Sequence, residues 1–133
     1  MGVMAARPDR LRLSIRHQRQ ETLMNETVVP QDLDIPTYQQ HQRDQIPHTL
    51  VDVRENWEYA MGHIEGAVNI PLNELPQHLD HIPEDRPVVV VCAHGVRSVY
   101  GAQFLSNQGY GGVYNLMGGT AEWIERGLPL SHA

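Results

Sequence analysis

Short apolar stretches recur along the chain between stretches that are polar or rich in Gly and Pro. Where β-branched residues are frequent in such stretches, the pattern is typical of strands. Residues 88–91 are four consecutive valines, so both alternating faces are apolar, which favours a central parallel strand with helices on each side. The pattern predicts strands at 49–53, 67–70, 88–91 and 113–116.

Helical segments are expected between these strands. Pro36 suits the first turn of a helix that Asp34 opens and that runs through 38–45. Pro76 interrupts a helical stretch over 72–82, which predicts two turns joined at an angle. The other expected helices cover 55–61, ended by Gly62; 98–107, where Val99, Ala102 and Leu105 recur every third residue; and 118–126, which begins at Gly118-Gly119-Thr120.

Strands that alternate with helices through short connections predict an α/β fold with a mainly parallel sheet. The pattern accounts for residues from about 28 to 130 and indicates one domain with one core. Four aromatic residues at helical positions are interpreted as core anchors: Trp57, Tyr59, Phe104 and Trp123.

The charges are unevenly distributed along the chain. All ten basic residues are arginines, and five of them lie in the first 20 positions. From Met24 onward, five arginines stand against fourteen carboxylates, a net charge of −9. A nucleic-acid-binding protein needs a basic face, so this balance argues against a nucleic-acid partner and requires a local pocket for any small anion.

The single cysteine and the short apolar runs indicate a cytoplasmic protein with no membrane partner. One cysteine cannot form an intramolecular disulfide, which favours a reducing compartment. Crossing a bilayer takes about 18 apolar residues, more than any run here. Residues 1–24 are expected to be a disordered extension or upstream sequence from an earlier start codon, with the folded domain at 25–133.

Cys92 directly follows the valine strand. Ligands of open parallel sheets bind beyond the carboxyl ends of the strands, where the next helices begin. The loop after Cys92 can turn several backbone N–H groups toward an anion, and Gly95 gives the conformational freedom that such a turn needs. These donors, the helix N-terminus and Arg97 would lower the pKa of the thiol and make it a nucleophile. The residues alone leave open a small buried core cysteine.

Three stretches resemble the rhodanese-like (sulfurtransferase) family, in particular its single-domain members. They are LVDVRENWEYAMGHIEGAVNIP at 50–71, VVVVCAHGVRS at 88–98 and VYNLMGGTAEWIERGLPL at 113–130. They carry the spacing D-x-R, E-Y, G-H-I-x-G-A and N-I-P, and they span about 100 of the 133 residues. The resemblance implies one rhodanese-like domain with a central, mainly parallel five-stranded sheet and helices on both faces.

The resemblance also implies a sulfurtransferase that needs no cofactor. Cys92 would take the sulfane sulfur of a small anionic donor such as thiosulfate, release sulfite and carry a persulfide. Cyanide, a small thiol or a protein sulfur acceptor would then remove that sulfur. The residues expected to bind the donor are Ala93, His94, Gly95, Val96 and Arg97.

Two features of this loop bear on the donor. Arg97 is a better anion partner than His94, because its charge persists at all relevant pH values. Ala93 stands where many family members carry a cationic or polar side chain that can meet a sulfonate. The natural donor therefore stays open.

Loop length separates the alternatives within the fold. Cys92 to Arg97 spans six residues, as in the sulfur-handling members, whereas the related phosphatases and arsenate reductases have a C-x₅-R loop. Ser98 occupies the position of their arginine, and the chain has no second thiol that could resolve an arsenate reductase intermediate. A non-catalytic binding or regulatory module is the remaining alternative, although such modules often lack the cysteine.

Asp52 and Arg54 form the D-x-R motif, and they are expected to brace the loops as an ion pair or cap. Glu58 and Glu65 are both open as their partners. Ser98 is expected to support the site as well.

Three histidines and a glycine pair are interpreted as structural. His63 is expected to make structural hydrogen bonds, and Gly118–Gly119 to permit close backbone packing near the site. His78 and His81 form an H-x-x-H pair on a solvated helix face rather than a metal site, because no cysteine or carboxylate cluster completes a zinc ligand set.

Overall fold

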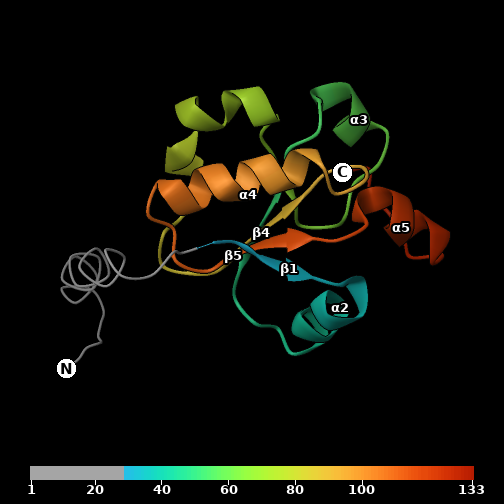
Figure 1. Cartoon of the computed structure of the whole chain (residues 1–133). Coiled ribbons are helices and arrows are strands. Elements are labelled where there is room, and N and C mark those ends of the chain that lie inside the picture. The colour runs from blue at the N-terminus through green and yellow to red at the C-terminus, as the bar shows by residue number, and fades with distance from the viewer. Residues whose placement is uncertain (1–28) are drawn as a thin grey trace.

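A five-stranded sheet organises residues 29–133, the part of the chain that this computed structural model describes (Figure 1). The spatial order is β1-β5-β4-β2-β3, and every neighbouring pair is parallel. The predicted α/β fold with a five-stranded parallel sheet is therefore confirmed. The strands are β1 (Gln31–Leu33), β2 (Thr49–Asp52), β3 (Val68–Asn69), β4 (Val88–Val91) and β5 (Val113–Leu116).

Helices cover both faces of this sheet. Figure 1 shows α4 across one face, beneath the two 3₁₀ segments, and α2 on the opposite face. Among the described residues no helix is both long and apolar enough to cross a membrane. The helices are α2 (Ile35–Arg43), α3 (Asn56–Ala60), α4 (Arg97–Asn107) and α5 (Gly119–Glu125), and the 3₁₀ segments are η1 (Leu72–Gln77) and η2 (Leu79–His81).

The valine strand β4 lies at the centre of the sheet, as predicted. Its side chains alternate between two core clusters, because successive residues of a strand point to opposite faces. Val88 and Val90 pack in the cluster beneath α4, whereas Val89 and Val91 pack in the cluster with α2 and α5. Cys92 continues the first series, so the strand period directs its thiol toward α4.

Helix α4 forms where the sequence predicts it, but its buried face differs from the expected one. The buried positions are Ser98, Gly101, Ala102 and Leu105, which follow the helical repeat of three and four residues. Val99 points away from this stripe and is 47% exposed. The first buried position belongs to a polar residue, Ser98, which contacts the thiol described below.

Three other expectations change or fall outside the described chain. The stretch 72–82 forms two 3₁₀ segments rather than α-helical turns, and they join at His78, with Pro76 inside the first. The fifth strand, β1, has a single buried residue, Leu33, and this leaves too little apolar pattern to locate it from the sequence. The predicted extension over 1–24 lies outside the described residues.

The four aromatic residues expected in the core divide into three groups. Trp123 is 4% exposed, and its indole N–H donates to the Pro129 carbonyl at 2.8 Å. Tyr59 and Phe104 are partly buried against the two clusters. The interpretation of Trp57 as a core anchor is wrong, because it lies on the short helix α3, which buries none of its residues, and is 66% exposed.

The two tryptophans provide a matched test of the core. Trp123→Ala should lower the free energy of unfolding by about 3–5 kcal/mol, because it leaves a cavity between α2 and the sheet. Trp57→Ala should change it by less than about 0.5 kcal/mol, as at other exposed positions. Equilibrium unfolding in urea measures both, and equal losses would contradict this assignment of the core.

Candidate active site

The thiol of Cys92 lies at the carboxyl end of β4, at the start of the loop that leads to α4, and the residue is 1% exposed. Its Sγ accepts hydrogen bonds from the backbone N–H groups of Gly95 at 3.1 Å and of Ser98 at 3.3 Å. Gly95 has a φ of +89°, the left-handed conformation that the expected tight turn requires. Ser98 lies in the first turn of α4, so one donor comes from a helix N-terminus, where partial positive charge favours an anion.

Burial has the largest effect on the pKa of the Cys92 thiol, and on its own it raises that pKa. It is opposed by the Ser98 hydroxyl, to the extent that this hydroxyl donates to the sulfur, and by hydrogen bonds from the backbone of Ser98, Gly95 and His94. Together they outweigh burial, so the pKa lies below its ordinary value. The donors that favour the thiolate are thus neutral groups of the loop and helix.

Helix α5 holds the loop from behind. The N–H groups of Thr120 and Ala121 donate to the carbonyls of Cys92 and Ala93, each at 2.9 Å. In a planar trans peptide the N–H points opposite to the C=O. With both carbonyls turned to α5, the following N–H groups, including that of His94, point to the other side, where the sulfur lies.

Gly119 makes this contact between helix and loop possible. Its φ is +61°, and a Cβ built on it would overlap the carbonyl oxygens of Cys92 and Ala93. This agrees with the interpretation of Gly118–Gly119 as a site of close backbone packing.

Arg97 ends the loop and is paired with Glu58 on α3. Its Nη1 and Nη2 donate to the two carboxylate oxygens at 2.7 and 3.1 Å. The hydrogen bonds with Arg97 lower the pKa of Glu58 to about 2, although burial acts in the opposite direction. The guanidinium is therefore already engaged by an anion of the protein itself.

Asp52 and Arg54 form a buried pair beside the loop. The carboxylate accepts Nε of Arg54 at 3.0 and 3.1 Å and Nη2 at 2.8 Å, and Nη2 also donates to the Gly62 carbonyl. Asp52 pairs in register with Val91, the residue before the cysteine. The motif thus fastens the end of β2 to the α3 region, and neither Glu58 nor Glu65, which the sequence left open as partners, supplies its ion pair.

The family model of the rhodanese-like domain matches residues 35–126, which include the whole sheet except β1. The chain belongs to the rhodanese-like domain family. A protein of Allochromatium vinosum named sulfurtransferase is 38% identical over 99 residues, covering 74% of this chain and 92% of that protein. The thiosulfate sulfurtransferase GlpE of Shewanella oneidensis is 42% identical over 76 residues, covering 57% and 75%.

Solved structures agree with this assignment. The crystal structure of a rhodanese-related protein from Thermoplasma volcanium superimposes with a TM-score of 0.70 at 31% identity. The alignment covers 77% of this chain and 99% of that one. The predicted single-domain rhodanese-like fold is therefore confirmed.

In this rhodanese-like domain, the residues expected at the site lie in or beside the loop, but they do not all contact the thiol. Ser98 contacts the thiol directly, and Asp52 and Arg54 brace a neighbouring loop. His94 and Val96 are exposed at the rim.

Sequence reasoning missed the residues that reach the loop from distant segments. The sequence offered Glu58 only as a partner of the Asp52–Arg54 motif. Nothing in the local pattern marked Asn115, which accepts a hydrogen bond from the Ser98 hydroxyl, or the backbone N–H groups of Thr120 and Ala121. The G-G-T triplet was the single local signal for the α5 contact.

The three other histidines considered from the sequence make their contacts outside the loop. His63 is 4% exposed, its Nδ1 lies 3.0 Å from the Tyr59 carbonyl and its ring stacks on Tyr59, which agrees with a structural role. His78, Asp80 and His81 bring potential metal-ligand atoms within 4.8 Å of one another. His78 is half-buried and the other two are exposed. A solvated surface rather than a metal site therefore stays the prediction for this group.

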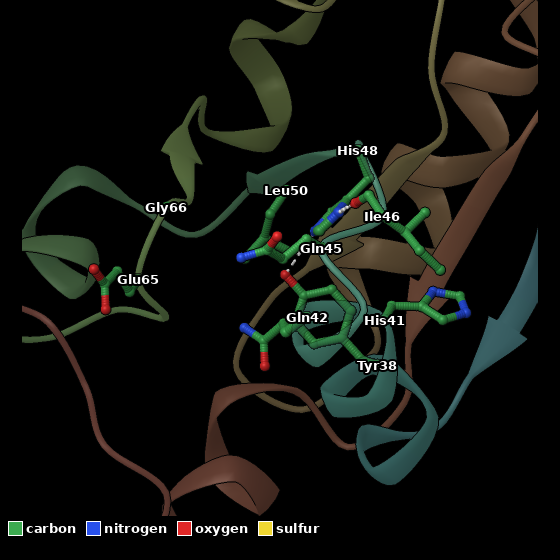
Figure 2. Close-up of a pocket in the computed structure, with 9 residues that line it drawn as sticks. All are labelled: Tyr38, His41, Gln42, Gln45, Ile46, His48, Leu50, Glu65 and Gly66. Carbon is green, nitrogen blue, oxygen red and sulfur yellow. Dashed lines mark hydrogen bonds between the residues drawn. The ribbon is translucent and has the colours of Figure 1, made fainter.

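A hollow of about 260 Å³ lies elsewhere on the molecule, and Figure 2 shows the residues that line it, none of which belongs to the loop after Cys92. Nδ1 of His48 lies 2.7 Å from the Ile46 carbonyl, which can only accept, so Nδ1 carries the proton. Nε2 then accepts the Tyr38 hydroxyl at 3.0 Å. Burial raises the pKa of Tyr38 to about 12, so this phenol stays protonated. The hollow offers no activated nucleophile that would compete with Cys92.

Two left-handed glycines allow a controlled test of the α5 contact. Gly119→Ala should displace the loop and slow alkylation of Cys92 at pH 7 by about tenfold, equivalent to a rise of one pKa unit. Gly127 has a similar φ of +74° but open space around it, so Gly127→Ala controls for backbone strain alone. Iodoacetamide kinetics that remain unchanged in both variants would contradict the assigned role of Gly119.

The ion pair of Glu58 and Arg97 predicts a defined pH dependence. Because the pKa of Glu58 is lowered from 4.5 to about 2, its contribution to stability is complete above pH 4.5 and is lost as the pH falls toward 2. Glu58→Gln should therefore be less stable than the parent at pH 7, by about 1 kcal/mol for a partly exposed pair, and equal to it near pH 2. Urea unfolding at several pH values measures this difference. Glu125→Gln, at the exposed end of α5, controls for the loss of a carboxylate. A difference in the free energy of unfolding between Glu58→Gln and the parent that stayed constant with pH would refute the assignment.

Proposed function

We propose that this protein is a sulfurtransferase that passes a sulfane sulfur from a small anionic donor such as thiosulfate to a thiophilic acceptor through a persulfide on Cys92. The observation that carries the proposal is the buried Sγ with the N–H groups of Gly95 and Ser98 at 3.1 and 3.3 Å. The names of the relatives, sulfurtransferase and thiosulfate sulfurtransferase, support the same reaction class.

The reaction needs no external oxidant or reductant. The Cys92 thiolate attacks the terminal sulfur of thiosulfate and forms an S–S bond, while the original S–S bond breaks and sulfite leaves with its electron pair. Cyanide or a thiolate then attacks the outer sulfur and releases the Cys92 thiolate. The proposal includes no cofactor and no metal, because each step is a displacement at sulfur.

The loop amides are the donors that would hold the developing negative charge. The α5 contact orients the first of them, the turn at Gly95 and the start of α4 place the others, and preorganised N–H groups stabilise charge without reorganising. Because Arg97 is paired with Glu58, the carboxylate offsets much of the attraction that the guanidinium would exert on an anionic donor. We therefore assign Arg97 to guiding the donor at the edge of the loop and to holding the loop in place. The proposed binding residues are Ala93 to Arg97, with the backbone contributing more than the side chains.

The size of the loop favours sulfur over a tetrahedral oxyanion. Where a C-x₅-R loop has its arginine, this chain has Ser98, which is fully buried with its N–H directed at the sulfur. A phosphatase or arsenate reductase would need a guanidinium around the bound oxyanion. We propose that the acceptor is a small thiol or a protein thiol in the cytoplasm, where a single unpaired cysteine stays reduced.

Mass spectrometry tests the proposal directly. Incubation with thiosulfate should add the mass of one sulfur atom to the intact protein, and cyanide should remove it and yield thiocyanate. Cys92→Ser should show neither adduct nor thiocyanate while keeping the unfolding transition of the parent. The absence of an adduct with thiosulfate and also with polysulfide would favour the alternative of a non-catalytic binding module.

A further inference from the structure

A buried line of polar side chains runs from Cys92 to the edge of the sheet. The Ser98 hydroxyl lies 3.3 Å from Sγ and donates to Asn115 Oδ1 at 2.5 Å. Asn115 Nδ2 donates to Asp32 Oδ1 at 3.1 Å. Ser98 is fully buried and Asn115 is 5% exposed, whereas Asp32 is exposed on the edge strand β1.

The sheet register places these groups in line. Asp32 pairs with Asn115 between β1 and β5, and Asn115 pairs with Val90 between β5 and β4. Side chains paired in register lie on the same face of a sheet. Val90 and Cys92 belong to the cluster beneath α4, the helix that carries Ser98.

The Ser98 hydroxyl has only one proton, and this limits which hydrogen bonds it can make with the thiol and with Asn115. A serine hydroxyl has a single proton to donate and can also accept. While that proton is directed to Asn115, the hydroxyl can accept the S–H of the neutral thiol but cannot donate to a thiolate. It can support the thiolate only by turning away from Asn115 and leaving a buried carbonyl oxygen without this donor.

Asp32 determines which end of the Asn115 amide faces Ser98. A carboxylate only accepts, so the NH₂ group of the amide turns to Asp32 and the oxygen turns to Ser98. Without this acceptor the amide could turn and present its NH₂ group, which would leave the hydroxyl proton free for the sulfur.

We propose that Asn115, oriented by Asp32, is a positioning residue of the site that holds the hydroxyl proton of Ser98 and withholds it from the Cys92 thiolate. This inference rests on Cys92 being the reactive thiol of the proposed function. A thiolate that is stabilised less is a stronger nucleophile, because intrinsic nucleophilicity falls as the pKa falls. Asn115 thus keeps the reactivity of a sulfur that already accepts two backbone N–H groups.

The charged groups around the loop do not account for this arrangement. Arg97 is paired with Glu58, and Arg54 with Asp52. Asp32 is a further charged group; it is exposed, so solvent and salt screen it, and its removal alone should change the thiol pKa little but in the same direction as the loss of its hydrogen bond. The test must therefore separate the charge of Asp32 from its role as an acceptor.

The rate of iodoacetamide alkylation against pH measures the thiol pKa and does not depend on sulfur transfer. Asn115→Leu and Asp32→Ala should each lower that pKa by about one unit, the effect of one hydrogen bond to an ionised group. Asp32→Asn removes the same charge but retains an acceptor oxygen, so it should keep the parental pKa. In a Ser98→Ala background, neither Asn115→Leu nor Asp32→Ala should shift the pKa further.

Three results would overturn the inference: an unchanged or higher pKa in Asp32→Ala, an equal shift in Asp32→Asn, or shifts that persist in the Ser98→Ala background. Asp32 is exposed, so its variants keep the test decisive even if Asn115→Leu does not fold. A protein that shows the predicted pKa pattern but forms no persulfide would retain this network and lose only the proposed function.

Discussion

Two hydrogen bonds, from the N–H groups of Thr120 and Ala121 to the carbonyls of Cys92 and Ala93, set the orientation on which the site depends. Because each carbonyl is held against α5, the N–H group of the following residue must point to the opposite side. The curl at Gly95 and the start of α4 then bring further N–H groups to the sulfur. The loop is thus shaped from outside, by a helix that begins 27 residues after the cysteine, rather than by its own side chains.

A buried thiolate supported in this way needs no adjacent cation. Burial alone would raise the pKa of Cys92, and neutral donors reverse that effect. The arginines nearby are each committed to a carboxylate, Arg54 to Asp52 and Arg97 to Glu58, so they fix positions rather than add free charge. The arrangement stabilises negative charge on sulfur while the surrounding ion pairs stay neutral overall.

Local patterns were sufficient to predict the α/β class, four of the five strands and the location of the thiol, whereas the fifth strand was implied only by the family resemblance. Four valines with both faces apolar predicted the central strand, and the residue that follows such a strand must lie at its carboxyl end. The distant partners could not be predicted, because Glu58 reaches Arg97 from 39 positions away and Asn115 reaches Ser98 from 17, and no short-range spacing encodes such contacts. Trp57 and Val99 were misjudged for a related reason: a short helix and the first turn of α4 expose residues that apolarity alone would bury.

The negative charge of the chain from Met24 onward makes the local hydrogen-bond donors important. From Met24 onward the net charge is −9, so the long-range field opposes the approach of an anionic sulfur donor. Salt screens that field over about 8–10 Å, whereas N–H groups within 3.5 Å of the sulfur act inside this range. In the proposed reaction, an anionic donor that reaches the loop would meet N–H donors that outweigh this field. The same field would favour the departure of an anionic product. A site built from fixed amides in an acidic protein would thus support both steps of the proposed reaction, the capture of the donor and the release of the product.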